Sequence, residues 1–269
     1  MKRATFAMLL GALGLASWPL WIWFASGTVD GSNDSAGLLA AAAAIAIVLR
    51  PLPTAAPGLP RRSPLRYPLL LPIICMMLYL AATLAGVALS ARALLVALAL
   101  ASLASAYRMD KYIDVALLGL CMLALPLAAT LQFYAGYPLR VLAGELAVML
   151  LKLNGMAVMR DGAMLAWSGK LVAIDAPCSG LKMLWAALFL ACALSAALHL
   201  SAARTLVAVT LAALVVIVAN AVRASALFYS EAGIVQLPTW SHSALGMVCF
   251  GGAALAILFA VRAIRGEAA

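Results

Sequence analysis

Apolar runs close to the length of a membrane-spanning helix follow one another along most of the chain. Crossing a bilayer in an α-helix takes roughly 20 consecutive apolar residues. Eight runs approach that length, at residues 4–26, 36–49, 68–90, 93–106, 113–135, 181–200, 205–227 and 243–261. The second and fourth are short, so their boundaries stay open. We expect an all-α integral membrane protein, a polytopic bundle of about eight transmembrane helices.

The composition supports this class. Hydrophobic residues make up 67% of the 269 residues and charged residues only 10%, whereas a soluble domain carries about 25% charged residues. The mean hydropathy is +1.11. We find no internal repeat and no soluble segment of domain size, which predicts a single membrane domain over residues 1–269.

The net charge of +9 follows the rule that Lys and Arg collect in cytoplasmic loops. With the N-terminus inside, the inner face carries Lys2, Arg3, Arg50, Arg61, Arg62, Arg66, Arg108, Lys111, Arg204, Arg262 and Arg265. The short outer loops carry only Arg92. We therefore expect both termini in the cytoplasm and no nucleic-acid partner.

The segment 136–179 is the longest one expected outside the membrane. Its first part has leucines at helical spacing, while Glu145 and Lys152 share another side. That pattern predicts an amphipathic helix lying at the membrane interface. The second part has short alternating runs separated by Asp161-Gly162 and Ser168-Gly169. Such dipeptides favour hairpin turns, so we expect a small extracytoplasmic β-meander.

Cys178 stands where this polar segment meets the sixth apolar run, in the stretch DAPCSGLKMLW. A helix that begins near Ser179 would direct backbone N–H groups and its positive dipole end toward the sulfur, and Lys182 lies one turn further on. Both features favour thiolate over thiol. Gly180 has no side chain to block a substrate backbone. We interpret Cys178 as a candidate nucleophile supported by these three residues.

Two other polar residues are expected at the same depth. Arg223 lies near the outer end of the seventh run, and His242 at the outer start of the eighth. A thiol, a proton acceptor and a fixed cation together suit nucleophilic catalysis with oxyanion stabilisation. Asn220 lies on the same helix face as Arg223, where it either orients the guanidinium or packs between helices.

Each of these residues also has an ordinary explanation. Cysteines in membrane helices often behave as small hydrophobic residues, an arginine near a helix end snorkels to headgroups, and a histidine caps a helix. A metal site is not expected, because the two histidines fall on opposite sides of the membrane and no Cys-x-x-Cys pair is present. No cofactor is expected either.

The order of three motifs resembles the exosortase/archaeosortase family of membrane cysteine transpeptidases. They are NGMAVMRDGAMLAWSGKLVAIDAPCSGLK, NAVRASALFY and SHSALG, which lie between Asn154 and Gly246. The resemblance places the family's nucleophile on Cys178, its arginine on Arg223 and its histidine on His242. Pro177, where a small residue is common, and Lys182, where arginine is frequent, depart from the usual pattern and leave subtype and substrate open.

The resemblance implies a cysteine peptidase and transpeptidase that acts on exported proteins of the PEP-CTERM kind. Their C-terminal sorting signal has a short motif, a transmembrane helix and a basic tail. The enzyme would cleave at the outer face of the membrane, among membrane lipids, and pass the acyl group to an unidentified nucleophilic acceptor. Two alternatives stay open: a transporter or channel with Arg223 as an anion site, and a membrane acyltransferase that carries its acyl group on Cys178.

Overall fold

The computed structural model describes residues 3–29, 36–50, 67–174, 176–238 and 240–266. The basic loop expected between Arg50 and Tyr67 falls largely outside these residues. The chain divides into two compact units. The first unit contains residues 1–129 and 195–205, and the second contains residues 130–194 and 206–269. The single membrane domain expected over residues 1–269 stays a prediction.

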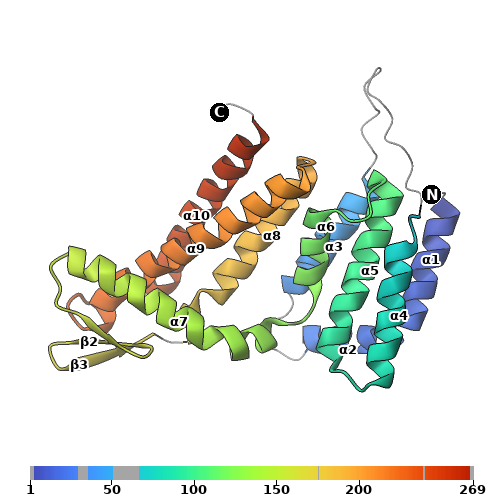
Figure 1. The fold of residues 1–269 in the computed structure, drawn as a ribbon. Helices are drawn as coiled ribbons and strands as arrows, with labels where there is room; N and C mark the ends of the chain where they lie inside the picture. The colour runs from blue at the N-terminus through green and yellow to red at the C-terminus, as the bar shows by residue number, and fades with distance from the viewer. Residues whose placement is uncertain (1–2, 30–35, 51–66, 175, 239, 267–269) are drawn as a thin grey trace. The chain divides into compact units, whose positions relative to one another are not determined.

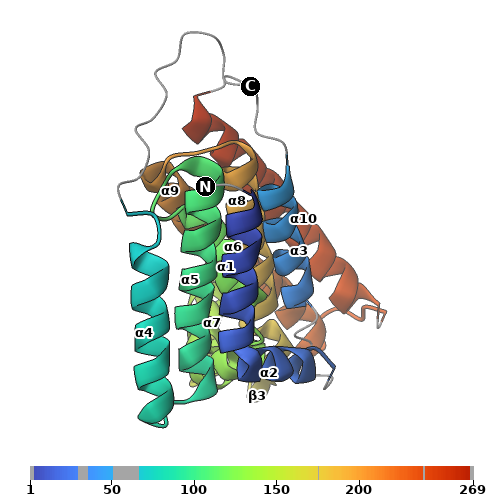
Figure 2. The same ribbon diagram turned by 90° about the vertical axis from the view of Figure 1, so that its right-hand side faces the viewer.

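The first unit is built from apolar helices that lie side by side, except α2, which lies crosswise at one end of them (Figures 1 and 2). Their bounds are α1 Arg3–Ala16, α2 Trp18–Val29, α3 Ala36–Leu49, α4 Leu70–Leu84, α5 Leu89–Met109 and α6 Val115–Ala124. Helix α5 packs against α1, α4 and α6, and α6 also packs against α3. A core cluster forms between α1, α4 and α5, around Leu13, Cys75, Tyr79 and Val96.

Two of the expected spans are interrupted in this unit. The run 4–26 bends by 76° between α1 and α2, where the Ser17 hydroxyl donates to the Leu13 carbonyl at 2.8 Å and Pro19 has no N–H for the next helical bond. The run 113–135 breaks between α6 and α7 at Pro126, because proline disfavours a helical conformation in the residue before it.

Helix α5 is longer than the expected run 93–106. Arg92 and Arg108 lower the hydropathy at the two ends of this run, yet both belong to the helix. The Arg92 guanidinium donates to the Thr83 hydroxyl at 3.2 Å. Arg108 donates to the Val48 carbonyl at 3.4 Å, and also to the Arg50 carbonyl. A terminal nitrogen of each guanidinium therefore has a partner, and the helix continues past both residues.

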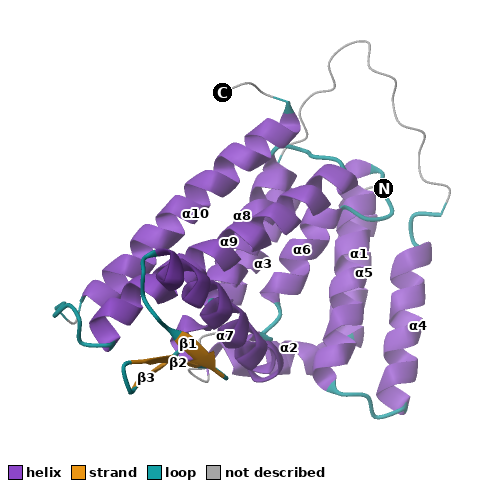
Figure 3. Cartoon of the chain, turned by 60° about the vertical axis from the view of Figure 1, so that its left-hand side comes forward, coloured by secondary structure: helices purple, strands orange, loops and turns teal. Residues whose placement is uncertain are grey.

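The second unit contains most of α7 Ala128–Leu153, α8 Leu181–Ala197 and α9 Ala202–Glu231, and α10 Ser241–Arg265. Helices α8, α9 and α10 run alongside one another, and α7 crosses them near the sheet (Figure 3). Helix α7 continues through Pro138, so the expected boundary at residues 135 and 136 is wrong: the end of one expected span and the expected interfacial helix form one element.

A three-stranded antiparallel sheet of order β1-β2-β3 follows α7, with strands Met159–Asp161, Met164–Trp167 and Lys170–Ala173. Ser168 and Gly169 form the second turn, both at positive φ, as a type I′ hairpin requires. The first turn uses Gly162 and Ala163, one residue later than the Asp-Gly pair suggested. The extracytoplasmic position of this sheet stays a prediction.

Within the described part of the chain, four helices are long and apolar enough to cross a membrane, namely α5, α7, α9 and α10. The bent pair α1 and α2 would add a fifth if it forms one span. Helices α3, α4, α6 and α8 are apolar but shorter. The fold is thus that of a mostly helical, multi-pass membrane protein, and the count of eight spans stays a prediction.

Candidate active site

Cys178 is carried by a short 3-10 turn, Ala176–Ser179, between β3 and α8. The sheet before it is anchored by an apolar cluster in which Leu165 and Val172 of the sheet pack with Leu151 of α7 and Phe228 of α9. The half-buried Cys178 packs against the same cluster. Docking of the sheet on α7 and α9 therefore fixes where the thiol lies.

The backbone after Cys178 is held by Asn220 of α9. The Asn220 side-chain amide donates to the Cys178 carbonyl at 3.0 Å. Gly180 has a φ of +79°, and a Cβ on it would lie 2.7 Å from the Asn220 amide nitrogen. Glycine is therefore required here by backbone conformation and by space. Asn220 fills the side of Gly180 on which a Cβ would lie, while Gly180 also lines a pocket, and the approach of a substrate backbone to this glycine stays a prediction.

His242 lies in the first turn of α10 and links the thiol to the guanidinium. Its Nε2 atom is 3.7 Å from the Cys178 Sγ and 3.2 Å from a terminal nitrogen of Arg223. All three side chains are half-buried. The structure thus brings together the three residues that the sequence singled out, from the turn before α8, from α9 and from α10.

Arg223 lies against the backbone of α10. A Cβ on Gly246 would lie 3.3 Å from the Arg223 Nε, so a larger residue would press on the guanidinium. The Nε atom is buried and has no hydrogen-bond partner among the described residues. An unsatisfied buried donor costs about 1–3 kcal/mol, and the Nε atoms of Arg92 and Arg108 are in the same state, so this feature does not by itself mark a ligand site.

The shared atom Nε2 constrains the chemistry. An imidazole nitrogen has either one lone pair or one proton. When Nε2 accepts from Arg223, it cannot also take the proton of the thiol. When it carries a proton and donates to a thiolate, the Arg223 N–H group has to turn elsewhere. The arrangement therefore has two states, which differ in the acceptor of Arg223.

The remaining predicted residues have different surroundings. The buried Ser179 donates from its hydroxyl to the Gln132 side-chain oxygen at a long 3.4 Å. Lys182 is exposed on the first turn of α8. Helix α8 begins at Leu181, two residues later than expected, so the intervening turn separates the sulfur from the helix start.

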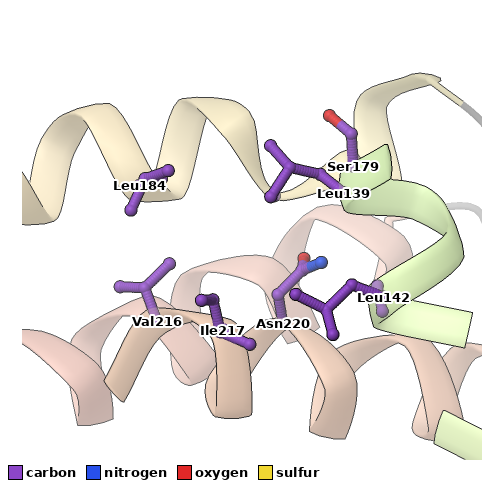
Figure 4. Close-up of a pocket in the computed structure, with 9 residues that line it drawn as sticks. Leu139, Leu142, Ser179, Leu184, Val216, Ile217 and Asn220 are labelled. Atoms are coloured by element: carbon purple, nitrogen blue, oxygen red, sulfur yellow. The ribbon is translucent and has the colours of Figure 1, made fainter. Parts of the chain in front are cut away.

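Two small pockets adjoin this centre. The first lies between α7, α8 and α9, and its apolar side chains include Leu139, Leu184 and Val216, with Ser179 and Asn220 at one end (Figure 4). The second is lined by the following residues of the sheet, of α9 and of the centre itself: Leu165, Val172, Ala173, Ile174, Cys178, Ala224, Leu227, Phe228, Glu231 and His242.

The sequence did not single out Gln132, Gly246 or the pocket residues Ala224, Leu227 and Glu231 of α9. A signal was available for the last group, because Asn220, Ala224, Leu227 and Glu231 recur at helical spacing and share one face. For Gly246 the signal was its spacing of four residues from His242. Gln132 offered none, because its contact with Ser179 joins segments far apart in the sequence.

Comparison with known proteins supports the resemblance seen in the motifs. No curated protein and no solved structure is significantly similar to the chain. The model of one family, described as transmembrane exosortase (Exosortase_EpsH), matches residues 23–259. This match covers most of the chain and includes Cys178, Arg223 and His242. The chain therefore belongs to the transmembrane exosortase family.

Proposed function

We propose that this protein is a cysteine peptidase and transpeptidase that removes the C-terminal sorting signal of exported proteins. The observation that carries the proposal is the contact of the Cys178 Sγ with His242 Nε2 at 3.7 Å, together with the contact of Arg223 with the same nitrogen. Proximity of a thiol and an imidazole is the usual arrangement of a cysteine nucleophile and its base.

In the first step, Arg223 turns away from Nε2, His242 takes the thiol proton on that nitrogen, and the Cys178 sulfur attacks the scissile carbonyl. The guanidinium of Arg223 then stabilises the negative charge of the oxyanion. When the intermediate collapses, the C–N bond breaks and His242 gives its proton to the leaving amine. The products are a thioester on Cys178 and the released sorting signal.

In the second step, an amine or hydroxyl acceptor attacks the thioester and loses its proton to His242. The Cys178 sulfur leaves as thiolate, takes that proton back and restores the enzyme. Water can replace the acceptor, in which case the reaction is hydrolysis. Asn220 supports both steps by holding the backbone of the nucleophile.

The proposed setting is the inner membrane of a bacterium, with both termini in the cytoplasm and the active site at the outer face. The distribution of Lys and Arg supports this topology. The substrates are exported proteins that end in a short motif, an apolar helix and a basic tail, as in PEP-CTERM proteins. A membrane-impermeant maleimide should label Cys178 in intact spheroplasts, and labelling only after permeabilisation would contradict this orientation.

The decisive experiment is Cys178→Ala in cells that make a tagged exported protein with such a tail. Processing should stop, whereas Cys192→Ala, which changes a buried cysteine of α8, should leave it intact. Unchanged processing by the Cys178 variant would reject the mechanism. Loss of function in Arg223→Ala but not in Cys178→Ser would indicate a transporter or channel. An adduct on Cys178 with the mass of a lipid or acetyl group would indicate an acyltransferase.

A further inference from the structure

The pocket between the sheet and α9 has the thiol and the imidazole in its wall. Its other walls are apolar side chains from β2, β3 and α9, among them Leu165, Val172 and Leu227. The carboxylate-bearing Glu231, which is exposed, also lines it. A pocket that shares its wall with the nucleophile is positioned to hold part of the substrate.

The bonds of the acyl-enzyme determine which part of the substrate lies in the pocket. In the thioester, the sulfur is bonded to the carbonyl carbon, that carbon to the Cα of the substrate residue, and the Cα to its side chain. This side chain is therefore held within three bonds of the Cys178 Sγ, while the leaving segment is free to depart. Since the sulfur lines the pocket, the adjacent side chain of the acyl residue has direct access to it.

We propose that this pocket selects the residue whose carbonyl is attacked and admits only a small, uncharged side chain there. The inference rests on the proposed peptidase function. The volume of the pocket is about 40 Å³, and one water-sized group needs about 10–15 Å³ measured in this way. The pocket therefore has room for only a few such groups, which favours alanine, serine, threonine, proline or valine over leucine and phenylalanine.

Ala224 and Leu227 set the size limit from α9. Both are buried, and both line the pocket. Ala224→Leu should fill the pocket, and Leu227→Ala should enlarge it. Ala226 is half-buried on the same helix but does not line the pocket, so Ala226→Leu is a matched control for added volume.

The test uses the full-length enzyme in membranes and a set of tagged reporters. Each reporter ends in six randomised residues, an apolar helix and an arginine-rich tail. Hydroxylamine serves as the acceptor, because it releases the acyl group from a thioester as a hydroxamate. Mass spectrometry of the products identifies the residue that carries the hydroxamate, which is the acyl residue.

With the wild-type enzyme, we expect small uncharged residues at this position and at least a tenfold depletion of leucine, phenylalanine and charged residues. Ala224→Leu should lower the yield of valine products at least tenfold more than that of glycine products. Leu227→Ala should let leucine products form, and Ala226→Leu should match the wild type. These shifts in preference do not depend on how much enzyme folds, because each compares two products of the same variant.

The inference and the underlying function fail in different ways. If the wild-type enzyme makes Cys178-dependent products without a size limit, or if Ala224→Leu lowers all products equally, the assigned pocket is wrong and the peptidase function stands. If the wild-type enzyme makes no hydroxamate product from any reporter, the proposed function is wrong, and the pocket assignment fails with it.

Discussion

Two arginines, one in each unit, lie in helices of similar apolar character and have different surroundings. Arg108 of the first unit is 7% exposed and donates to backbone carbonyls at the end of α3. Arg223 of the second unit is half-buried and contacts a histidine beside a thiol. The acceptors of Arg108 are backbone carbonyls, whereas the partner of Arg223 is an imidazole nitrogen, which can act as a hydrogen-bond donor or acceptor.

This difference indicates a structural role for Arg108 and favours the chemical role proposed above for Arg223. A buried charge is tolerated when hydrogen bonds compensate its desolvation, and the carbonyls that end α3 supply this for Arg108. At Arg223 the partner is the side chain of His242, which lies beside a thiol. The buried Nε of both arginines lacks a hydrogen-bond partner among the described residues, so the difference lies in the partners of the terminal nitrogens. The two arginines should therefore respond differently to substitution.

The largest effect is expected for Arg223→Ala. Loss of one preorganised oxyanion donor typically lowers turnover about 10²–10³-fold. We expect that decrease in the rate of reporter cleavage, with little change in the thermal unfolding of the purified protein. A large loss of stability with normal turnover of the folded fraction would make Arg223 a structural residue like Arg108.

Arg108→Ala should show the reverse pattern. Hydrogen bonds made by a charged group contribute about 1.5–3 kcal/mol, so we expect a loss of about 2–3 kcal/mol in the free energy of unfolding. Turnover per folded molecule should stay within about twofold, since the residue has no part in the proposed chemistry. Unfolding in detergent measures the loss of stability, and activity normalised to folded protein measures turnover. A loss of turnover without a loss of stability would show that Arg108 and Arg223 do not differ in role.

Gly180→Ala tests whether Gly180 and Asn220 together hold the backbone next to Cys178. An alanine at positive φ costs about 1–2 kcal/mol, and its Cβ would also press on Asn220. Asn220→Ala should relieve the crowding but not the strained φ, so the double variant should be less destabilised than the sum of the single variants. Additive losses of stability would show that the two residues do not interact.

The smallest effect is expected for Ser179→Ala. The hydrogen bond from its hydroxyl to Gln132 is long at 3.4 Å, and a typical hydrogen bond contributes about 0.5–1.5 kcal/mol. We expect at most about a threefold decrease in turnover. A decrease comparable to that of Arg223→Ala would show that Ser179 takes a direct part in the reaction.

Local patterns predicted the parts of the fold that depend on local physics. The Ser168-Gly169 turn was visible because only a few residue types adopt two successive positive φ angles. The breaks at Ser17 and Pro126 were missed because both lie within apolar runs, and a bend there does not lower the hydropathy of the run. The continuous helix through Pro138 was missed because tertiary packing overrides the low helix propensity of proline.

The sequence predicted which residues form the site better than it predicted the contacts between them. The ordered motifs around Cys178, Arg223 and His242 indicated which residues meet. They did not indicate that Arg223 contacts His242, because a sequence does not specify the rotation of α9 relative to α10. The contact of Gly180 with Asn220 was hidden for the same reason, although both residues were singled out.

The anchoring of the thiol by the sheet has a consequence for biogenesis. The position of the thiol depends on the sheet, because Cys178 follows β3 and packs against the cluster that joins the sheet to α7 and α9. If Cys178 is the nucleophile proposed above, a chain whose helices are inserted but whose sheet has not docked lacks the contact with His242 and is expected to be inactive.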